Sequence, residues 1–450
     1  MPRCTAKIGL LALAMGLLAL GGGCRTINKR LSEAVQDPGK AKQWSVHYGS
    51  HGHYQLDNDR LKGLEFEGCT EGDRIKVHYQ RGLAESAQCI ADETTRLLEA
   101  VEQRLGLTIT TRSTIPLLRF DEIPQNFDIS LKGEPNEFPL PLFVQAGDES
   151  CRSILAQNRS YPYLFVHELV ETSLACSETG GRVLPDMGWS FLGLHAHVDN
   201  HTRWFREGLA NYAGYIAHEI ARQDLADAKD APAGRALVHS HPFSALDDIG
   251  VKLFSWSQYS RARNQEDHYN AALGLFLLIA DEYGEQAIRE IMAEIAKRKI
   301  VDGRDLLEIA KQATGTDLKQ LAAAFRFPQT GLKLDDLTAA TALNKGLDVR
   351  RGLLVEALEP NGLADQAGLE PNDVIVAIDD NAVADELDYE LALFKARARP
   401  SVSLSLWRAG TGTLAIDLPL WPGDHQAPEP GKRRNPLKKG RIDFVILSVR

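Results

Sequence analysis

The chain has 450 residues, of which 25% are charged and 44% hydrophobic, and its formal net charge is -10. This composition is typical of folded globular domains and excludes a chain that is disordered throughout. The negative charge argues against a nucleic-acid-binding protein, which needs a basic surface. The length predicts two or three domains.

The first 23 residues carry the pattern of a secretion signal. Arg3 and Lys7 give a positive start, and an almost unbroken apolar run follows from Ile8 to Leu20. This run has the length of a signal-peptide core and is too short to cross a membrane comfortably. Residues 1–23 are therefore predicted to direct export.

The end of this signal resembles the lipobox of bacterial lipoproteins, in which small residues precede a cysteine that becomes a lipidated N-terminus. Three glycines precede Cys24, although Gly21 stands where an aliphatic residue is usual. The resemblance implies a periplasm-facing lipoprotein of the cell envelope, anchored to the membrane through Cys24. Arg25 and Thr26 offer no aspartate retention signal, which favours the outer membrane. The alternative is ordinary signal cleavage, with Cys24 taking no part.

Four cysteines remain after Cys24, and an even number in an oxidising compartment allows disulfides. They are Cys69, Cys89, Cys151 and Cys176. Pairing by neighbourhood predicts Cys69–Cys89 and Cys151–Cys176, which is one of three connectivities. The other interpretation is that one pair consists of buried thiols.

The chain divides by pattern into an α+β arrangement. Short strand-like runs, RIKVHY, LTITT and IPLLRF, surround a helical stretch from Ala84 to Leu105, and the segment from Tyr161 to Phe327 is mostly helical. Short strands broken by Gly, Pro and Asn-Gly signals follow. The predicted parts are a tether at 24–50, a β-rich region at 51–150, a mainly helical domain at 151–330, a β-domain at 333–420, and a linker with a basic tail at 421–450.

The most informative segment is YPYLFVHELVETSLA, residues 161–175, whose apolar residues have the spacing of a buried helical face. On such a helix His167 and Glu171 share a face, and Glu168 lies one position along. This spacing follows the logic of HExxH metallopeptidases, in which two ligands one turn apart accompany a glutamate base. Here Glu171 replaces the second histidine. By itself the segment is more typical of an ordinary helix with surface carboxylates.

A second segment, RWFREGLANYAGYIAHEIA at 203–221, strengthens the case. Its apolar stripe has helical spacing, and Glu207 lies off that stripe beside Trp204, Gly208 and Asn211. A carboxylate buried in such a helix needs a partner, and a metal ion is one such partner.

These two segments together resemble the gluzincins of peptidase clan MA. In that family a helix downstream of HExxH carries a third metal ligand in the pattern Trp, two residues, Glu-Gly, one residue, Ala, one residue, Tyr. The matching residues are Trp204, Glu207, Gly208, Ala210 and Tyr212. The resemblance covers about residues 160–326 and implies a metallopeptidase fold.

The resemblance also implies a ligand set and a chemistry. His167, Glu171 and Glu207 would hold the ion, and Glu168 would take a proton from water and return it to the leaving amine. The expected cofactor is Zn²⁺. Because two of three ligands are carboxylates, the preference for zinc over other divalent metals should weaken.

Tyr269 begins a long apolar helix followed by a Tyr-Gly stop and the run ATGTDLKQL, an order seen downstream of the site in gluzincin-like peptidases. The resemblance implies that Tyr269 donates a hydrogen bond to the oxyanion during catalysis. The simpler interpretation is a tyrosine that packs on the core.

Three histidines lie between the two motif segments: His195, His197 and His201. His197 and His201 are four residues apart. One of them could supply the missing imidazole, or they could form a site with Glu207. A polar loop with solvated histidines is the simpler interpretation.

Residues 350–380, RRGLLVEALEPNGLADQAGLEPNDVIVAIDD, resemble a bacterial PDZ domain. Such a domain binds an extended peptide by strand addition and holds its C-terminal carboxylate with backbone N–H groups. Gly352, Leu353 and Leu354 would form the carboxylate-binding loop. The alternative is a β-domain with a degenerate, empty groove.

The layout is similar to that of the glycyl-aminopeptidase-like family. The first hypothesis is an envelope-anchored metallopeptidase whose PDZ domain binds peptide or protein C-termini, with no nucleic-acid partner. The second is a catalytically inactive, peptidase-like scaffold that binds peptides or envelope proteins. Glu171 in place of histidine favours the second hypothesis, whereas the presence of both Glu168 and Glu207 favours the first.

Overall fold

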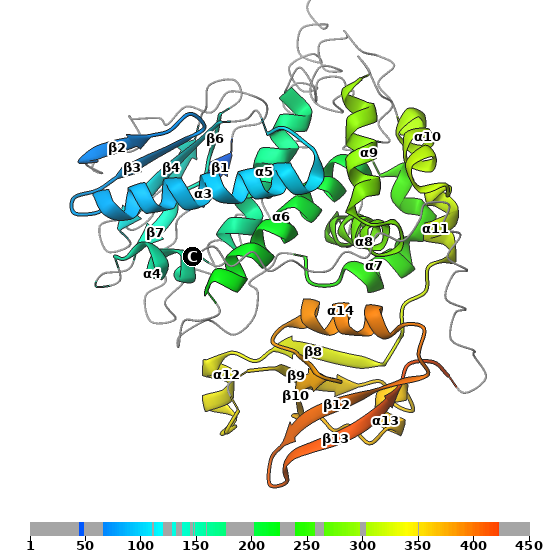
Figure 1. The fold of residues 1–450 in the computed structure, drawn as a ribbon. Helices are drawn as coiled ribbons and strands as arrows, with labels where there is room; N and C mark the ends of the chain where they lie inside the picture. The colour runs from blue at the N-terminus through cyan, green and yellow to red at the C-terminus, as the bar shows by residue number, and fades with distance from the viewer. Residues whose placement is uncertain are drawn as a thin grey trace, which may run out of the picture.

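The protein is described by a computed structural model, in which helices and strands are assigned between Ser45 and Pro419 (Figure 1). The described residues are 45–48, 66–109, 112–119, 128–131, 137–144, 147, 149–158, 160–176, 202–225, 239–256, 265–297, 303–349 and 351–422. The predicted signal peptide, Cys24, the three loop histidines at 195–201 and nearly all of the predicted tail lie outside them. Among the described residues, no helix combines the length and the hydrophobicity that crossing a membrane requires.

The first part of the structure is a mixed sheet covered by one long helix (Figure 1). The strand order is β2-β3-β4-β6, with β7 also paired to β4, and every pair is parallel except β2 with β3. The elements are β2 (Gly68–Glu71), β3 (Ile75–Tyr79), α3 (Ala84–Leu105), β4 (Arg112–Arg119), β6 (Glu137–Pro139), β7 (Leu142–Val144) and α4 (Cys151–Gln157).

Helix α3 confirms the prediction made for this stretch. Its apolar residues Leu97, Leu98, Val101 and Leu105 recur at helical spacing and are all buried. The helix ends at Gly106, which adopts a positive φ of 65°, a conformation that glycine takes at little cost. Of the predicted strands, RIKVHY and IPLLRF correspond to β3 and β4, but Leu107–Ile109 of LTITT are not in a strand.

A further parallel pair joins β1 (Ser45–Tyr48) and β5 (Asp128–Leu131). Strand β1 falls within residues 24–50, so the predicted tether contains at least one strand. The partnered residues, such as Ser45 and Asp128, are far apart in sequence, which local pattern alone does not reveal.

The predicted disulfide pairing was wrong. Cys89 of α3 is bonded to Cys151, the first residue of α4, and Cys69 is free. Cys69 lies on β2, where its sulfur is 3.9 Å from His78 Nε2. Sequence neighbourhood failed because α4 returns to pack against α3, which brings together two cysteines 62 residues apart.

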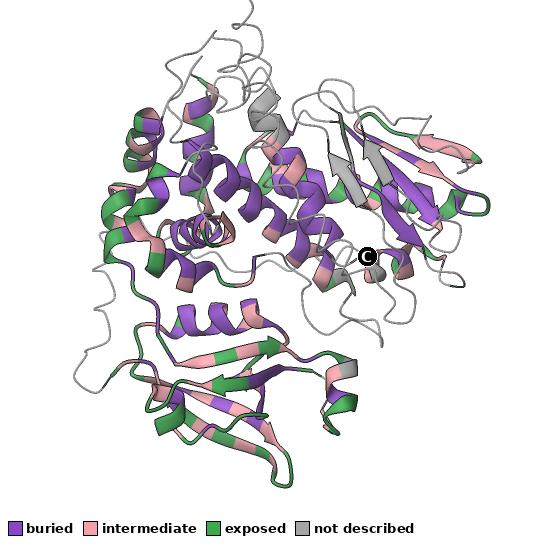
Figure 2. Cartoon of the chain, turned by 180° about the vertical axis from the view of Figure 1, so that it is seen from behind, coloured by how far each residue is buried: buried purple, intermediate pink, exposed green. Residues whose placement is uncertain are grey.

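The second part is helical, and its centre is almost wholly buried (Figure 2). Helix α5 packs along α6, α6 packs along α8, and α7 and α9 both pack on α8. The helices are α5 (Tyr161–Cys176), α6 (Arg203–Leu225), α7 (Pro242–Ile249), the 3-10 helix η3 (Gly250–Ser255), α8 (Gln265–Tyr283), α9 (Glu285–Ala296), α10 (Gly303–Thr314) and α11 (Leu318–Ala324).

Two glycines allow α6 to approach its neighbours closely. A Cβ atom on Gly214 would lie 2.6 Å from the backbone oxygen of Tyr163 on α5. A Cβ atom on Gly208 would lie 2.7 Å from the ring of Phe276 on α8. Any larger residue would push the helices apart, so these glycines fix how closely the residues on α5, α6 and α8 can meet.

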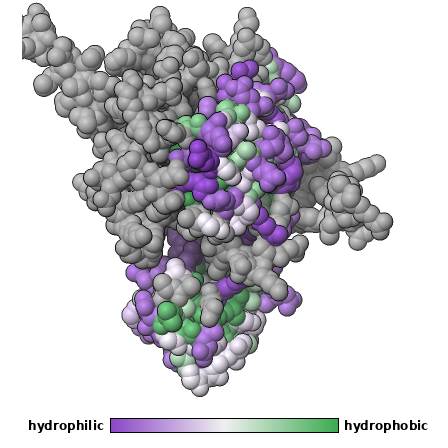
Figure 3. Space-filling model, turned by 90° about the vertical axis from the view of Figure 1, so that its left-hand side faces the viewer, coloured by the Kyte–Doolittle hydropathy of each residue, from purple (hydrophilic) through white to green (hydrophobic). Residues whose placement is uncertain are grey.

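The third part is a strand-rich domain in the order β13-β12-β10-β9-β8, with the short β11 paired to β10. The fold class is therefore mixed helix and strand, as predicted. Apolar side chains reach the surface of this domain on the face shown in Figure 3, whereas much of the described surface above it is hydrophilic. The elements are β8 (Leu332–Asp336), α12 (Ala339–Asn344), β9 (Leu353–Leu358), α13 (Leu363–Gln366), β10 (Val374–Ile378), β11 (Asn381–Ala382), α14 (Glu386–Ala396), β12 (Ser401–Arg408) and β13 (Gly412–Pro419).

The structure does not fit the peptide-binding role predicted for Gly352, Leu353 and Leu354. Leu353 and Leu354 begin β9, an interior strand that pairs with β8 on one side and with β10 on the other. Both leucines are buried, and Gly352 packs against the backbone of Ile375. Strand addition needs an unpaired edge. The GLLV pattern marks the entry to a buried strand, which sequence alone does not distinguish from an open edge.

Helix α14 lies between the strand-rich domain and the helical part (Figure 1). The rings of Phe394 on α14 and Phe243 on α7 are stacked with centroids 3.9 Å apart. At the far end of α14, Arg397 pairs with Asp281 and Glu282 of α8. At the N-terminal end of α14, the Arg222 guanidinium of α6 donates to both carboxylate oxygens of Asp388 at 3.2 Å.

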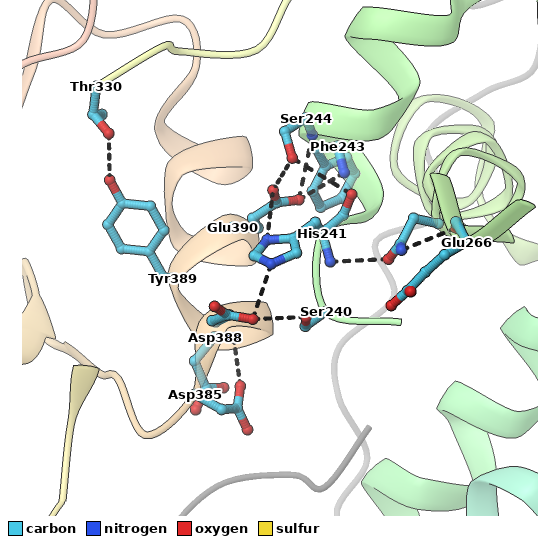
Figure 4. A network of polar contacts seen from close by, with 12 residues as sticks. Ser240, His241, Phe243, Ser244, Glu266, Thr330, Asp385, Asp388, Tyr389 and Glu390 are labelled. Carbon is cyan, nitrogen blue, oxygen red and sulfur yellow. Dashed lines mark hydrogen bonds and ion pairs between the residues drawn. The ribbon is translucent and has the colours of Figure 1, made fainter. Parts of the chain in front are cut away.

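Polar contacts complete this interface (Figure 4). Glu390 of α14 accepts hydrogen bonds from the backbone N–H groups of Phe243 and Ser244 and from the Ser244 hydroxyl. His241 Nε2 lies 2.9 Å from Glu386 and its Nδ1 lies 3.7 Å from Glu390. These carboxylates hold the pKa of His241 at about 10, against the cost of partial burial. The histidine is therefore protonated at neutral pH and links the two parts.

Candidate metal centre

Three of the predicted site residues meet between α5 and α6. His167 is 3% exposed and Glu207 2% exposed. His167 Nε2 lies 3.9 Å from Glu171 Oε2 and 3.7 Å from Glu207 Oε2. Glu171 shares a helix face with His167, and the contact of Gly214 with Tyr163 and with His167 Cβ brings α6 alongside.

These distances are compatible with a shared ion. Ligand atoms bound about 2.0–2.2 Å from a tetrahedral zinc ion lie roughly 3.3–3.5 Å from one another. The observed 3.7 and 3.9 Å need only a small contraction. Glu207 Oε2 is buried and makes no hydrogen bond with any described residue, which is costly for a carboxylate oxygen without a cation nearby. His167, Glu168 and Glu171 bring ligand atoms close enough together to hold a metal ion. Glu207 is not part of that group, although its Oε2 approaches the same imidazole nitrogen, so it would have to move toward Glu171 to share an ion.

Glu168 belongs to the same cluster. The ligand atoms of His167, Glu168 and Glu171 all lie within 4.8 Å of one another. Burial raises the pKa of Glu168 well above its usual range, and the charges of Glu171 and Glu207 raise it further. Burial and Glu207 also raise the pKa of Glu171, whereas Arg206, His167 and Arg203 lower it. Three crowded carboxylates therefore need positive charge beside them.

Two arginines that the sequence analysis did not single out supply part of that charge. Arg203 Nε donates to Glu207 Oε1 at 3.1 Å, and Arg206 Nε lies 3.3 Å from Glu171 Oε1. Burial alone would lower the pKa of Arg203, but Tyr269, Glu207 and Glu171 together raise it, so the guanidinium stays charged. Both arginines lie on the motif helix, where charged residues are usually solvated, and only their burial identifies them.

Tyr269 also reaches this cluster. Its hydroxyl accepts a hydrogen bond of 2.6 Å from Arg203 and donates one of 3.3 Å to Glu207 Oε1. Its backbone oxygen accepts from Asn211, whose own side-chain oxygen accepts from Tyr163. The fully buried Asn211 thus ties α5, α6 and α8 together behind the site, a role that its position beside Glu207 only hinted at.

Aromatic rings form one wall of the cluster. Tyr163 stacks on the His167 imidazole, with centroids 6.1 Å apart, and His239 stacks on Tyr269 at 5.2 Å. His239 is buried and also meets Tyr163 edge-on. The sequence analysis did not single out His239, because the residues around it do not have the spacing of metal ligands.

Comparison with known proteins identifies the C-terminal domain. Residues 354–408 match the PDZ domain family. The chain is 28% identical over 125 residues to an HtrA-like serine protease of Staphylococcus haemolyticus, a match that covers 28% of this chain and 17% of that protein. The matched region thus spans about a sixth of the curated relative's length. The class that these findings define is a multidomain protein with a C-terminal PDZ domain.

Two solved structures are also similar to parts of this chain. The HtrA-type protease AlgW with a decapeptide is 25% identical, has a TM-score of 0.20 and covers 26% of this chain and 35% of its own. An aminopeptidase N family protein of Idiomarina loihiensis is 13% identical, has a TM-score of 0.37 and covers 80% of this chain and 67% of its own.

Proposed function

We propose that this protein is a metal-dependent peptidase whose PDZ domain binds peptide ends, anchored in the bacterial envelope through Cys24. The observation that carries the proposal is the convergence of Glu171 Oε2 and Glu207 Oε2 on His167 Nε2, within 3.9 Å. The anchoring part rests on the sequence of the signal and lipobox.

His167, Glu171 and Glu207 would hold the ion, with Zn²⁺ the first candidate and other divalent metals favoured more than in a site rich in histidine. When bound, the ion supplies a Lewis acid that polarises the scissile carbonyl and makes water more acidic. The two carboxylate ligands leave it a weaker Lewis acid than a site with two imidazoles would.

Glu168 is the proposed proton carrier. A raised pKa makes its carboxylate a strong base toward water and makes its protonated form stable enough to hold the proton until the leaving amine needs it. Both steps use the same side chain, which the helix holds one position from His167. Tyr269 is proposed to stabilise the oxyanion, which requires its hydroxyl to turn from Glu207 Oε1 toward the substrate.

For the PDZ domain, we place the peptide on the edge strand β8. This strand pairs only with β9 among the described strands, its residues are partly or fully exposed, and it lies beside α14. A peptide added there would gain backbone hydrogen bonds from the edge and side-chain contacts from the helix. β13 is the opposite edge, and peptide binding that survives disruption of β8 would point to it.

One observation favours a second function, an inactive peptidase-like scaffold. Arg203 and Arg206 already place two positive charges among the carboxylates, and Glu171 stands where the family has histidine. A cluster neutralised in this way would be stable without an ion.

Cleavage of a broad peptide library separates the two functions. Full-length protein supplied with zinc should cleave peptides, chelation should stop it, and Glu168→Gln should remove the activity while leaving metal content near one equivalent per chain. A matched control is Glu219→Gln on α6, whose carboxylate faces Arg222 away from the site. Wild type that is as inert as Glu168→Gln would leave the scaffold as the better account.

A further inference from the structure

In Glu207 and in Glu171, the two carboxylate oxygens have different neighbours: one oxygen faces an arginine and the other faces His167. In Glu207, Oε1 accepts from Arg203 while Oε2 faces His167 Nε2. In Glu171, Oε1 lies 3.3 Å from Arg206 Nε while Oε2 faces the same nitrogen. Each arginine therefore contacts one oxygen and leaves the other directed at the centre.

We propose that Arg203 and Arg206 are positioning residues that orient Glu207 and Glu171 as single-oxygen metal ligands, an inference that rests on the proposed metal-dependent function. A carboxylate that is free to rotate about its last torsion presents either oxygen, or both, to an ion. A guanidinium that is hydrogen-bonded to one oxygen, as Arg203 is to Glu207, or ion-paired with one, as Arg206 is with Glu171, restricts that freedom. Partners of this kind hold metal ligands in place and tune their affinity.

Both guanidiniums are themselves held in place. Arg203 lies over the ring of Trp256 at 4.6 Å and donates to the Tyr269 hydroxyl at 2.6 Å, so aromatic and polar contacts both fix it. Arg206 is 5% exposed, and its Nη2 lies 3.9 Å from Glu207 Oε1 in addition to its contact with Glu171. A buried side chain with contacts to both ligand carboxylates cannot swing away at little cost.

The opposite role, in which the arginines take the place of the ion, fits the contacts less well. A guanidinium that neutralises a buried carboxylate typically does so with two parallel N–H bonds to both oxygens. Neither arginine does this here. Among the described residues, Glu207 Oε2 has no hydrogen bond, and the 3.3 Å approach of Arg206 Nε to Glu171 Oε1 is an ion pair without hydrogen-bond geometry. The arrangement leaves acceptor atoms directed at one point, which suits an added cation.

The test is the zinc dissociation constant of full-length protein, measured by competition with a chelating indicator. We expect Arg203→Met and Arg206→Met to weaken zinc binding by about 10- to 100-fold, the usual effect of losing such a partner. The matched control is Arg222→Met, which removes an arginine of the same helix that pairs with Glu219 and Asp388 instead. That control should bind zinc like wild type.

Arg206→Lys separates orientation from charge. It keeps the positive charge but lacks the planar fork, so positioning predicts an affinity between those of wild type and Arg206→Met. Circular dichroism and thermal unfolding identify any variant that fails to fold. If a methionine variant misfolds, the lysine variant at the same position takes its place in the comparison. A lysine variant that binds zinc with the affinity of wild type would then overturn the proposal.

Three other outcomes are distinct. Methionine variants that bind zinc as tightly as wild type, or more tightly, overturn the positioning role while leaving the metal centre standing. Wild type and variants that all fail to bind zinc or manganese overturn the proposed function and the positioning role with it. Variants that bind zinc when wild type does not would show that the arginines occupy the place of the ion, which also overturns the proposal.

Discussion

Two of the places where the described residues bury carboxylates differ in how those carboxylates are paired. At the interface of α7 and α14, Glu390 is 4% exposed and accepts from two backbone N–H groups and one hydroxyl, with the protonated His241 beside it. Between α5 and α6, Glu207 is 2% exposed, and one of its oxygens makes no hydrogen bond within the described part of the chain.

This difference indicates which cluster stabilises the fold and which is suited to binding. A buried polar group that has all its partners stabilises one arrangement, whereas one that lacks a partner costs stability and persists where function needs it. The interface cluster has a donor for nearly every carboxylate oxygen, and it joins two parts of the chain. The cluster on α5 and α6 gathers three carboxylates around one imidazole edge and leaves an acceptor open, as expected of a binding centre.

The sharpest way to break this comparison is Glu168→Gln. Loss of the proton carrier should lower peptide cleavage by about 10²- to 10⁴-fold. The same change should raise the free energy of unfolding of the metal-free protein by about 1 kcal/mol, because it removes a carboxyl group whose ionisation Glu171 and Glu207 oppose. Urea titration and initial cleavage rates measure the two effects. A mutant that is both active and less stable contradicts the account.

The interface cluster should behave in the opposite way. Glu390→Leu leaves the N–H groups of Phe243 and Ser244 without their acceptor and removes the more distant of the two carboxylates beside His241, so it should lower the free energy of unfolding by about 3–5 kcal/mol. Chemical denaturation followed by fluorescence measures this loss. Glu219→Gln, a control in a partly exposed ion pair with Arg222, should change stability by less than about 0.5 kcal/mol. A Glu390→Leu protein as stable as wild type would remove the distinction between the clusters.

The interface should also depend on pH through His241. Its pKa is raised from 6.5 to about 10 in the folded protein, so its contribution to stability is complete below pH 6.5 and is lost as pH rises through 10. After allowance for partial exposure, the loss should be about 1–2 kcal/mol between pH 6 and 10.5. Unfolding curves of wild type and His241→Asn measure it. Parallel pH profiles for the two proteins would contradict the assignment.

The smallest effect is expected at Asp336, beside the same interface. Burial and the charges of Asp385 and Glu386 raise its pKa from 3.8 to about 7. Its ionisation therefore costs stability as pH rises from 3.8 through 7, and Asp336→Asn should relieve under about 1 kcal/mol at pH 8 and nothing at pH 3. The Asn side-chain oxygen can still accept from Glu386 N–H, the bond that Asp336 makes. A destabilised Asn variant at pH 8 would contradict this reading.

Helical periodicity, motif spacing and the resemblance to the gluzincins together brought His167, Glu168, Glu171 and Glu207 into one hypothesis. Two of these pairings are local to α5, and the glycine-containing motif on α6 signals a close helix contact. The arginines were missed because nothing in a sequence shows that a charged side chain on an amphipathic helix points inward. The Asn211 bridge was missed because its partners come from two other helices.

Long-range packing limited the rest of the prediction. The Cys89–Cys151 bond, the pairing of β1 with β5 and the docking of α14 on α7 all join segments that are distant in sequence. The PDZ domain was identifiable because its strands and turns are local signals, whereas the free edge of its sheet depends on strand order.

Anomalous diffraction at the zinc edge, from crystals grown with zinc, tests the central claim most directly. The account predicts one strong peak about 2.0–2.2 Å from His167 Nε2, Glu171 Oε2 and Glu207 Oε2. The peak should vanish in Glu207→Gln crystals of the same form and persist in Glu219→Gln crystals. A well-ordered site with no peak, with Arg203 and Arg206 still paired to the carboxylates, would contradict the metal centre and favour the scaffold.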